Sequence, residues 1–217
     1  MAERDGTQQV LLDSAIRLFG QHGYEAVSTR MLAEHAGVNL AAIKYHFGSK
    51  DELYTGAIDA IIALIQPRLD MMAGIANQIK SVAGDDPQRQ ALVMTQLIHT
   101  ILTTFLETPA LQKVIPFILR ELFAPGPHFK RMYTGVPKRL HEMLTDLVAW
   151  ILDIEPDSVQ AKVRAHAVVG QMIVFQIGRP ILLNRLAAET YSATVIDEIR
   201  AQVTTSVLSS LGLPHEA

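Results

Sequence analysis

The stretch LAEHAGVNLAAIKYHFGSKDEL, residues 32–53, has the spacing of two short helices joined by a tight turn. The small Ala33 leaves space where two helices cross, and Gly37, four residues later, can adopt a left-handed turn conformation without steric cost. Ile43, ten residues after Ala33, is placed to pack the second helix against the first. The stretch therefore predicts a helix-turn-helix, whose remaining core positions are Leu32, Ala36, Val38 and Phe47.

Capping residues on either side of the turn agree with this layout. Ser28 and Asn39 precede the two helices, and their side-chain oxygens can accept hydrogen bonds from backbone N–H groups. Ser49, with Glu52 three residues later, predicts a capping box for a further helix. Each signal is common alone, but together they specify where three helices begin.

The rest of the chain has helical periodicity. Apolar residues recur at intervals of three and four in residues 12–19, 94–105, 140–151 and 196–207. The pairs Asp86-Pro87, Thr108-Pro109 and Glu155-Pro156 each predict a helix with proline at its first position. No alternating run is bounded by hairpin turns. We therefore expect an all-α protein.

This pattern predicts two domains. Residues 1–52 form the helix-turn-helix domain, and residues 53–217 form a domain of longer helices. The helix that opens after Ser49 joins them.

Composition excludes several classes of protein. The 217 residues contain no cysteine, so a disulfide, a thiolate zinc site and a thiol nucleophile are all excluded. The longest uncharged apolar segment, residues 165–178, is shorter than the ~20 residues of a membrane span. The N-terminus lacks the apolar region of a signal peptide. We expect a cytoplasmic protein without a membrane partner.

Known catalytic and metal-binding motifs are also missing from the sequence. It contains no nucleophile elbow, phosphate-binding loop, dinucleotide fingerprint or paired histidines on one helix. We therefore expect neither an enzyme nor a bound cofactor or metal, although an all-helical enzyme or a scaffold without DNA binding is the alternative to a DNA-binding protein.

The outward face of the second helix is suited to double-stranded DNA. A short exposed helix fits the major groove with its N-terminal residues toward the base edges. Because residues 1–55 carry fewer cations than acids, binding would depend on the placement of a few groups. The candidates are Thr29, Arg30, Asn39, Ala41, Lys44, Tyr45, His46 and Lys50. Lys50 would bind phosphate together with the free amides of the helix after Ser49. Alternatively, Lys50 is a solvated charge, the Tyr45 ring packs on the core and His46 fills space.

Residues 11–54, LLDSAIRLFGQHGYEAVSTRMLAEHAGVNLAAIKYHFGSKDELY, resemble the TetR family of bacterial transcriptional regulators. The shared signatures are F-x-x-x-G-Y at Phe19–Tyr24, Ala36-Gly37-Val38, and the run from Tyr45 to Leu53. The resemblance implies DNA contacts from the eight candidates above. One departure is Leu40, at a position where the family often has a cation, which suggests a more apolar contact with the groove.

Two later segments resemble the ligand-binding region of the CerR/CecR-like subgroup of this family. They are LQKVIPFILRELFAPGPHF, residues 111–129, and AHAVVGQMIVFQIGRPILLNRL, residues 165–186. A ligand pocket would be mostly apolar with a few polar groups. Its candidate residues, most of which are more often ordinary core than ligand contacts, are Phe105, Phe117, Arg120, Trp150, His166, Met172, Phe175 and Gln176.

The last two helices are expected at residues 156–177 and 192–211. The first is apolar most of the way round, and its small Ala167 and Gly170 would allow another helix to approach closely. Under the resemblance, each subunit of a homodimer contributes these two helices to a four-helix bundle. The alternative is burial inside a monomer.

Together these features predict a ligand-responsive transcriptional regulator, most simply a repressor. As a homodimer it would bind a palindromic operator. A small-molecule effector would release it from the DNA.

Overall fold

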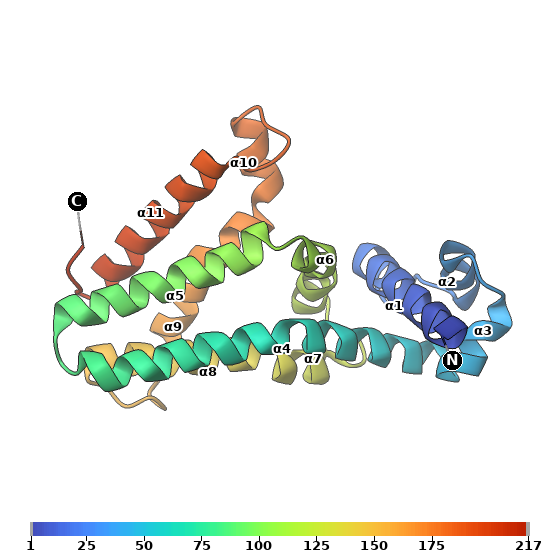
Figure 1. Ribbon diagram of the computed structural model, residues 1–217, viewed down its shortest axis with the longest axis horizontal. Helices are drawn as coiled ribbons and strands as arrows, with labels where there is room; N and C mark the ends of the chain where they lie inside the picture. Colours follow the sequence, from blue (N-terminus) through green and yellow to red (C-terminus); the bar gives the residue numbers. More distant parts are fainter. Residues whose placement is uncertain (1, 216–217) are drawn as a thin grey trace. The chain divides into compact units, whose positions relative to one another are not determined.

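In the computed structural model, residues 2–215 are described, and they form eleven α-helices and no strand (Figure 1). The expected all-α class is confirmed. The helices are α1 (Ala2–His22), α2 (Thr29–Ala36), α3 (Leu40–Phe47), α4 (Lys50–Ala83), α5 (Pro87–Glu107), α6 (Pro109–Phe123), α7 (Phe129–Gly135), α8 (Pro137–Leu152), α9 (Val159–Ile177), α10 (Arg179–Arg185) and α11 (Ala193–Ser210).

The helices pack into two units. The first unit contains the chain up to Pro67 together with Pro109–Pro137, and the second contains Arg68–Thr108 and the chain from Lys138 onward. The expected boundary at residue 52 falls inside α4, so the packing units and the expected functional domains are different segments. The packing units differ from the expected domains because α6 packs against α1, although the two helices are far apart in the sequence.

The predicted helix-turn-helix forms in the first unit. Ser28 accepts a hydrogen bond from the Met31 amide at 3.2 Å, and Asn39 accepts one from the Ala41 amide at 2.9 Å. Gly37 ends α2 in the left-handed conformation, with φ 67°. Ile43 is buried. The local signals of the sequence therefore place both helices correctly.

The core of the first unit is a cluster of aromatic rings. The Phe19 and Tyr54 ring centres are 4.8 Å apart, and Tyr54 also packs against Tyr24 and Phe117. A Cβ atom at Gly20 would lie 2.9 Å from the Phe117 amide nitrogen, so glycine is needed for this approach of α1 to α6. The cluster fixes the position of the α1 end, from which the chain continues into α2.

The second unit is built around α5, α9 and α11, and α5 runs beside α11 (Figure 1). The stripe of α5 that includes Leu97, Ile98 and Ile101 is buried. The predicted starts at Pro87 and Pro109 are confirmed. The start predicted at Pro156 is wrong.

Helix α9 begins at Val159 because Ser158 is its cap. The Ser158 hydroxyl accepts a hydrogen bond from the Ala161 amide at 3.1 Å, while Pro156 lies in the preceding turn. A serine side chain satisfies a free amide that the end of a helix exposes.

No single helix in the described part of the chain is long and apolar enough to cross a membrane. Among the described helices, α9 and α10 taken together reach the required length and composition, and they are bent by 61° at their junction.

Candidate nucleic-acid interface

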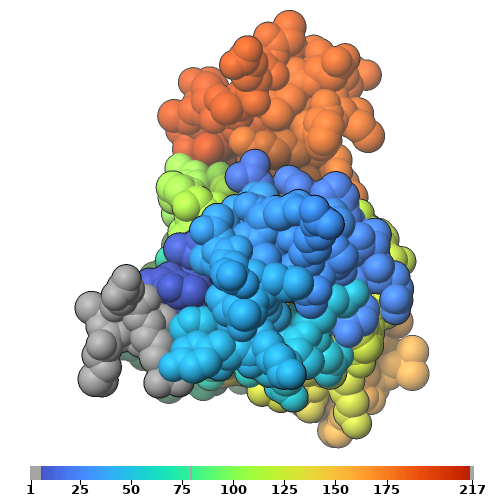
Figure 2. Space-filling view, turned by 90° about the vertical axis from the view of Figure 1, so that its right-hand side faces the viewer, coloured from blue at the N-terminus to red at the C-terminus, as the bar shows by residue number. Residues whose placement is uncertain are grey.

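The outward face of α3 is exposed, as the sequence predicts. Tyr45 is 67% exposed and Leu40 is 51% exposed, and Ala41 and Lys44 are also exposed. Figure 2 shows the residues of α2 and α3, in blue, as one continuous surface. The side chains predicted to meet DNA from α3 therefore share an accessible face.

The other candidates beside this face differ in accessibility. Arg30 and Asn39 are exposed, whereas Thr29 and His46 are half-buried. The Arg30 guanidinium donates a hydrogen bond to Glu34 at 2.8 Å. An exposed ion pair of this kind contributes little free energy, so Arg30 can exchange Glu34 for a phosphate group. The Tyr45 ring packs edge-on against the His46 ring, with centres 5.0 Å apart.

Lys50 has a structural role that the sequence does not reveal. Its ammonium group donates hydrogen bonds to the carbonyl oxygens of Tyr24 and Val27, at 2.8 and 2.9 Å, and lies over the Tyr24 ring. A lysine ammonium has three N–H donors, and two are used here. These hydrogen bonds hold the loop between α1 and α2 against the start of α4, and leave one donor for a phosphate group.

Two carboxylates occupy the first turn of α4, where a phosphate site was expected. Ser49 accepts a hydrogen bond from the Glu52 amide at 3.0 Å, which is one half of the predicted capping box. Asp51 accepts hydrogen bonds from His128 at 2.9 Å and from Tyr24 at 3.3 Å. The His128 hydrogen bond lowers the pKa of Asp51 below its ordinary value. Asp51 and Glu52 thus already place negative charge at the helix terminus, which weakens the expected attraction of a phosphate to its free amides.

Family models match two parts of the chain. The model of bacterial regulatory proteins of the tetR family matches residues 11–57. The model of the C-terminal domain of the HTH-type transcriptional dual regulator CecR matches residues 91–213. The CecR protein of Shigella flexneri is 30% identical over 198 residues, covering 89% of this chain and 86% of that protein. The chain belongs to the TetR family, with a C-terminal domain of the CecR type.

More distant relatives agree with this assignment. The transcriptional repressor AcnR of Corynebacterium glutamicum is 32% identical over 88 residues, which is 38% of this chain and 43% of that protein. A TetR-like transcriptional regulator from Rhodococcus sp. RHA1 has the same fold, with a TM-score of 0.59 at 18% identity, covering 95% of this chain and 96% of that one. This TetR-family protein is therefore a DNA-binding transcriptional regulator and not an enzyme.

The residues proposed for a ligand pocket do not lie in one unit. Phe117 and Arg120 belong to the first unit, where Arg120 donates hydrogen bonds to the Gly20 and Gln21 carbonyl oxygens at 2.9 and 2.7 Å. Arg120 therefore caps the end of α1, and Phe117 belongs to the aromatic cluster. These interactions account for both residues without a ligand.

The other six candidates belong to the second unit, where they have different partners. Gln176 donates a hydrogen bond to the Phe105 carbonyl oxygen, and the Phe175 carbonyl oxygen accepts one from Tyr191 at 2.9 Å. Met172 is buried, and His166 contacts His141.

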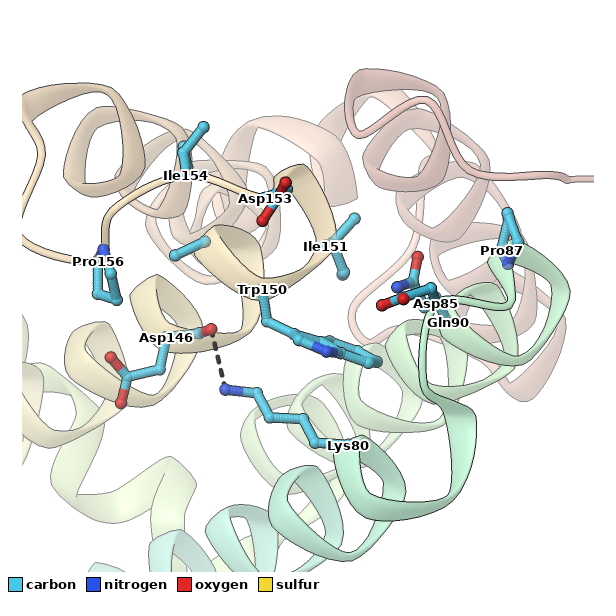
Figure 3. A pocket seen from close by; sticks show the side chains of 11 residues that line it. Lys80, Asp85, Pro87, Gln90, Asp146, Trp150, Ile151, Asp153, Ile154 and Pro156 are labelled. Carbon is cyan, nitrogen blue, oxygen red and sulfur yellow. Dashed lines mark hydrogen bonds between the residues drawn. The ribbon is translucent and has the colours of Figure 1, made fainter.

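Trp150 lines a pocket of about 620 Å³ in the second unit. The pocket lies where the end of α4, the start of α5 and the α8–α9 connection meet. Figure 3 shows the Trp150 side chain directed from α8 toward Asp85 and Gln90, with Lys80 alongside. Lys80 donates a hydrogen bond to the Asp146 carbonyl oxygen at 2.9 Å, and burial lowers its pKa. Lys80, Asp85 and Gln90 were missed because they lie near helix ends or in the turn between α4 and α5, where periodicity carries no signal.

Proposed function

We propose that this regulator is a cytoplasmic repressor that binds a palindromic operator as a homodimer and is released by a small-molecule effector. The observation that carries the proposal is the exposed face of α3. It presents Leu40, Ala41, Lys44 and Tyr45 on a helix whose start and preceding turn are fixed by Asn39 and Gly37. A rigid, exposed helix with polar and apolar groups suits the major groove.

Homodimer formation is supported by an uncovered apolar face on α9. Val159 is 78% exposed and Val163 is 61% exposed, and Ala167 and Val174 lie exposed on the same face of the helix. A Cβ atom at Gly170 would meet nothing within 4 Å, so another helix can approach closely there. The alternative expectation, that α9 is buried inside a monomer, does not agree with these exposures.

Two copies paired through one self-complementary face are related by a two-fold axis. Their α3 helices would then meet two half-sites of a palindrome, roughly 34–36 Å apart or a multiple of that distance. Repression is the simplest result of such binding, and the AcnR relatives are named as repressors. The CecR relative is named as a dual regulator, so activation at some promoters is the second candidate.

Release by an effector requires a ligand that binds one conformation better than the other. The shift in operator affinity cannot exceed the ligand's difference in affinity for the two conformations. The pocket around Trp150 is one place in the second unit with the volume for a small molecule.

Footprinting of the purified protein on genomic DNA tests this proposal. We expect protected sites with two-fold symmetry, at which the chain binds as two copies. Effector candidates inferred from the neighbouring genes should then lower affinity for those sites. Protected sites with no internal symmetry would contradict the homodimer, and protection of all DNA equally would contradict an operator.

A further inference from the structure

Two histidines from different helices of the second unit face each other. The Nε2 atom of His141, on α8, lies 3.0 Å from the Nδ1 atom of His166, on α9. The two rings are inclined by 27°, and their centres are 5.3 Å apart. His166 is exposed and His141 is half-buried, so solvent ions can reach the pair. Neither DNA binding nor the pocket around Trp150 accounts for it.

The chemistry of this pair matches that of metal ligands. In a hydrogen bond between two imidazoles, one nitrogen donates a proton and the other accepts it. Both nitrogens can bind one metal ion once the donating ring carries its proton on its other nitrogen, because neutral imidazole is a ligand for zinc, nickel and copper. Zn–N bonds of about 2.0–2.1 Å in a tetrahedral site place two nitrogens about 3.3–3.4 Å apart. The two rings meet nearly end to end, so both rings must rotate to open 3.0 Å to that distance and to direct their nitrogens at one ion.

We propose that His141 and His166 form a binding site for a divalent transition-metal ion of the zinc and nickel class, which links α8 to α9. Within residues 2–215, no group of three or more metal-ligating side chains is present. Water must therefore supply the remaining positions. Such a site is accessible in a single copy of the chain, and His166 lies on α9 beside the face proposed above for dimer formation.

Three of the cations near this histidine pair in the sequence are matched by carboxylates. Lys138 lies 3.5 Å from Glu142, and Lys162 lies 3.1 Å from Asp157. The guanidinium of Arg139, next to His141 in the sequence, is paired with Asp70 at 2.6 Å. Because each of these cations is matched by a carboxylate, their repulsion of a divalent ion is largely offset.

Thermal unfolding of the tag-free, full-length protein with Zn²⁺, Ni²⁺ and Mg²⁺ tests this site. At a concentration one hundred times Kd, Zn²⁺ or Ni²⁺ should raise Tm by roughly 5–10 °C, whereas Mg²⁺, which prefers oxygen ligands, should have no effect. His141→Ala and His166→Ala should each abolish the rise. His99→Ala, which removes a histidine from α5 in the same unit, should preserve it.

The site is overturned if the double variant His141→Ala/His166→Ala keeps the full rise in Tm, or if neither Zn²⁺ nor Ni²⁺ stabilises the wild type. NMR of the wild-type histidine rings provides a second test that needs no variant. Zn²⁺ should shift the signals of two histidines together, with one ion per chain. A shift of other histidine signals in their place would equally overturn the proposal.

Discussion

The ammonium group of Lys50 lies 4.2 Å from the centre of the Tyr24 ring and donates a hydrogen bond to the Tyr24 carbonyl oxygen at 2.8 Å. The same group donates to Val27, so one cation satisfies two carbonyl oxygens of the loop that leads into α2. The position of α2, and through it the exposure of α3, thus depends on a side chain from α4.

Replacing Lys50 by alanine should therefore destabilise the protein. Loss of the donor leaves two partly buried carbonyl oxygens unpaired, and we expect the free energy of unfolding to fall by about 1–3 kcal/mol. Chemical denaturation measures this change. The matched control is Lys44→Ala, which removes an exposed lysine from α3 and should change stability by less than about 0.5 kcal/mol. Equal stabilities for the two variants would mean that Lys50 is merely a surface charge.

Replacing Lys44 by alanine should lower the affinity for DNA and leave the stability of the fold nearly unchanged. If its ammonium pairs with a phosphate, Lys44→Ala should reduce the slope of log K against log salt by about 1 for each phosphate that is no longer neutralised. Binding to an operator duplex at several salt concentrations measures the slope. A slope identical to that of the wild type would show that Lys44 does not bind a phosphate.

Tyr54 and Glu121 form a buried pair whose disruption should be costly. Glu121 is 3% exposed and accepts a hydrogen bond from the Tyr54 hydroxyl. Burial and this carboxylate together raise the pKa of Tyr54 well above its ordinary value. Tyr54→Phe leaves a buried carboxylate short of a donor, so unfolding should require about 1–3 kcal/mol less.

Glu121→Gln is the matched variant, because its amide oxygen can still accept from Tyr54. It should cost less than Tyr54→Phe in the same denaturation experiment. The reverse order of stabilities would contradict the role assigned to the hydroxyl.

The pair of Asp51 and His128 should make stability depend on pH. His128 lowers the pKa of Asp51 in the folded protein, so Asp51 stabilises the fold above its ordinary pKa of about 3.9. This contribution is lost as the pH falls through the lowered pKa.

His128→Ala should accordingly be less stable than the wild type at pH 5, and the difference should shrink toward pH 3. Urea unfolding of both proteins at each pH measures this difference in stability. A difference that stays constant over this range would show that the ion pair does not contribute.

Local signals explain why the helix-turn-helix could be predicted from sequence. Ser28, Asn39 and Gly37 each act on backbone groups within a few residues, so spacing alone reveals their roles. The hydrogen-bond partners of Lys50 and Arg120 are distant in the sequence, so the sequence did not reveal their structural roles. Lys50 reaches a carbonyl 26 residues away, and Arg120 reaches one 100 residues away.

Competition between neighbouring signals explains the error at the start of α9. Pro156 and Ser158 are both favourable helix starters, and sequence does not rank them. The structure uses the serine, because its hydroxyl satisfies the Ala161 amide. The pocket beside Trp150 was only partly predicted for another reason: its walls come from three segments that are brought together by packing.

Association through α9 can be tested by placing a charge on its exposed face. Val163→Lys would bury an ammonium group between two apolar helices, and we expect it to convert a dimer to a monomer in sedimentation experiments. The matched control is Leu92→Lys on α5, at a residue that is 71% exposed. A dimer that survives Val163→Lys would place the interface elsewhere.

The affinity of the Tyr45→Ala variant for a footprinted operator duplex tests most directly whether α3 binds DNA. Because Tyr45 is exposed, Tm should be unchanged while binding weakens by about 1–3 kcal/mol, or roughly 5- to 150-fold. Tyr133→Ala, on α7, replaces another exposed tyrosine and should bind as tightly as the wild type. Equal affinities for wild type, Tyr45→Ala and Tyr133→Ala would contradict the assignment of this face of α3 to DNA.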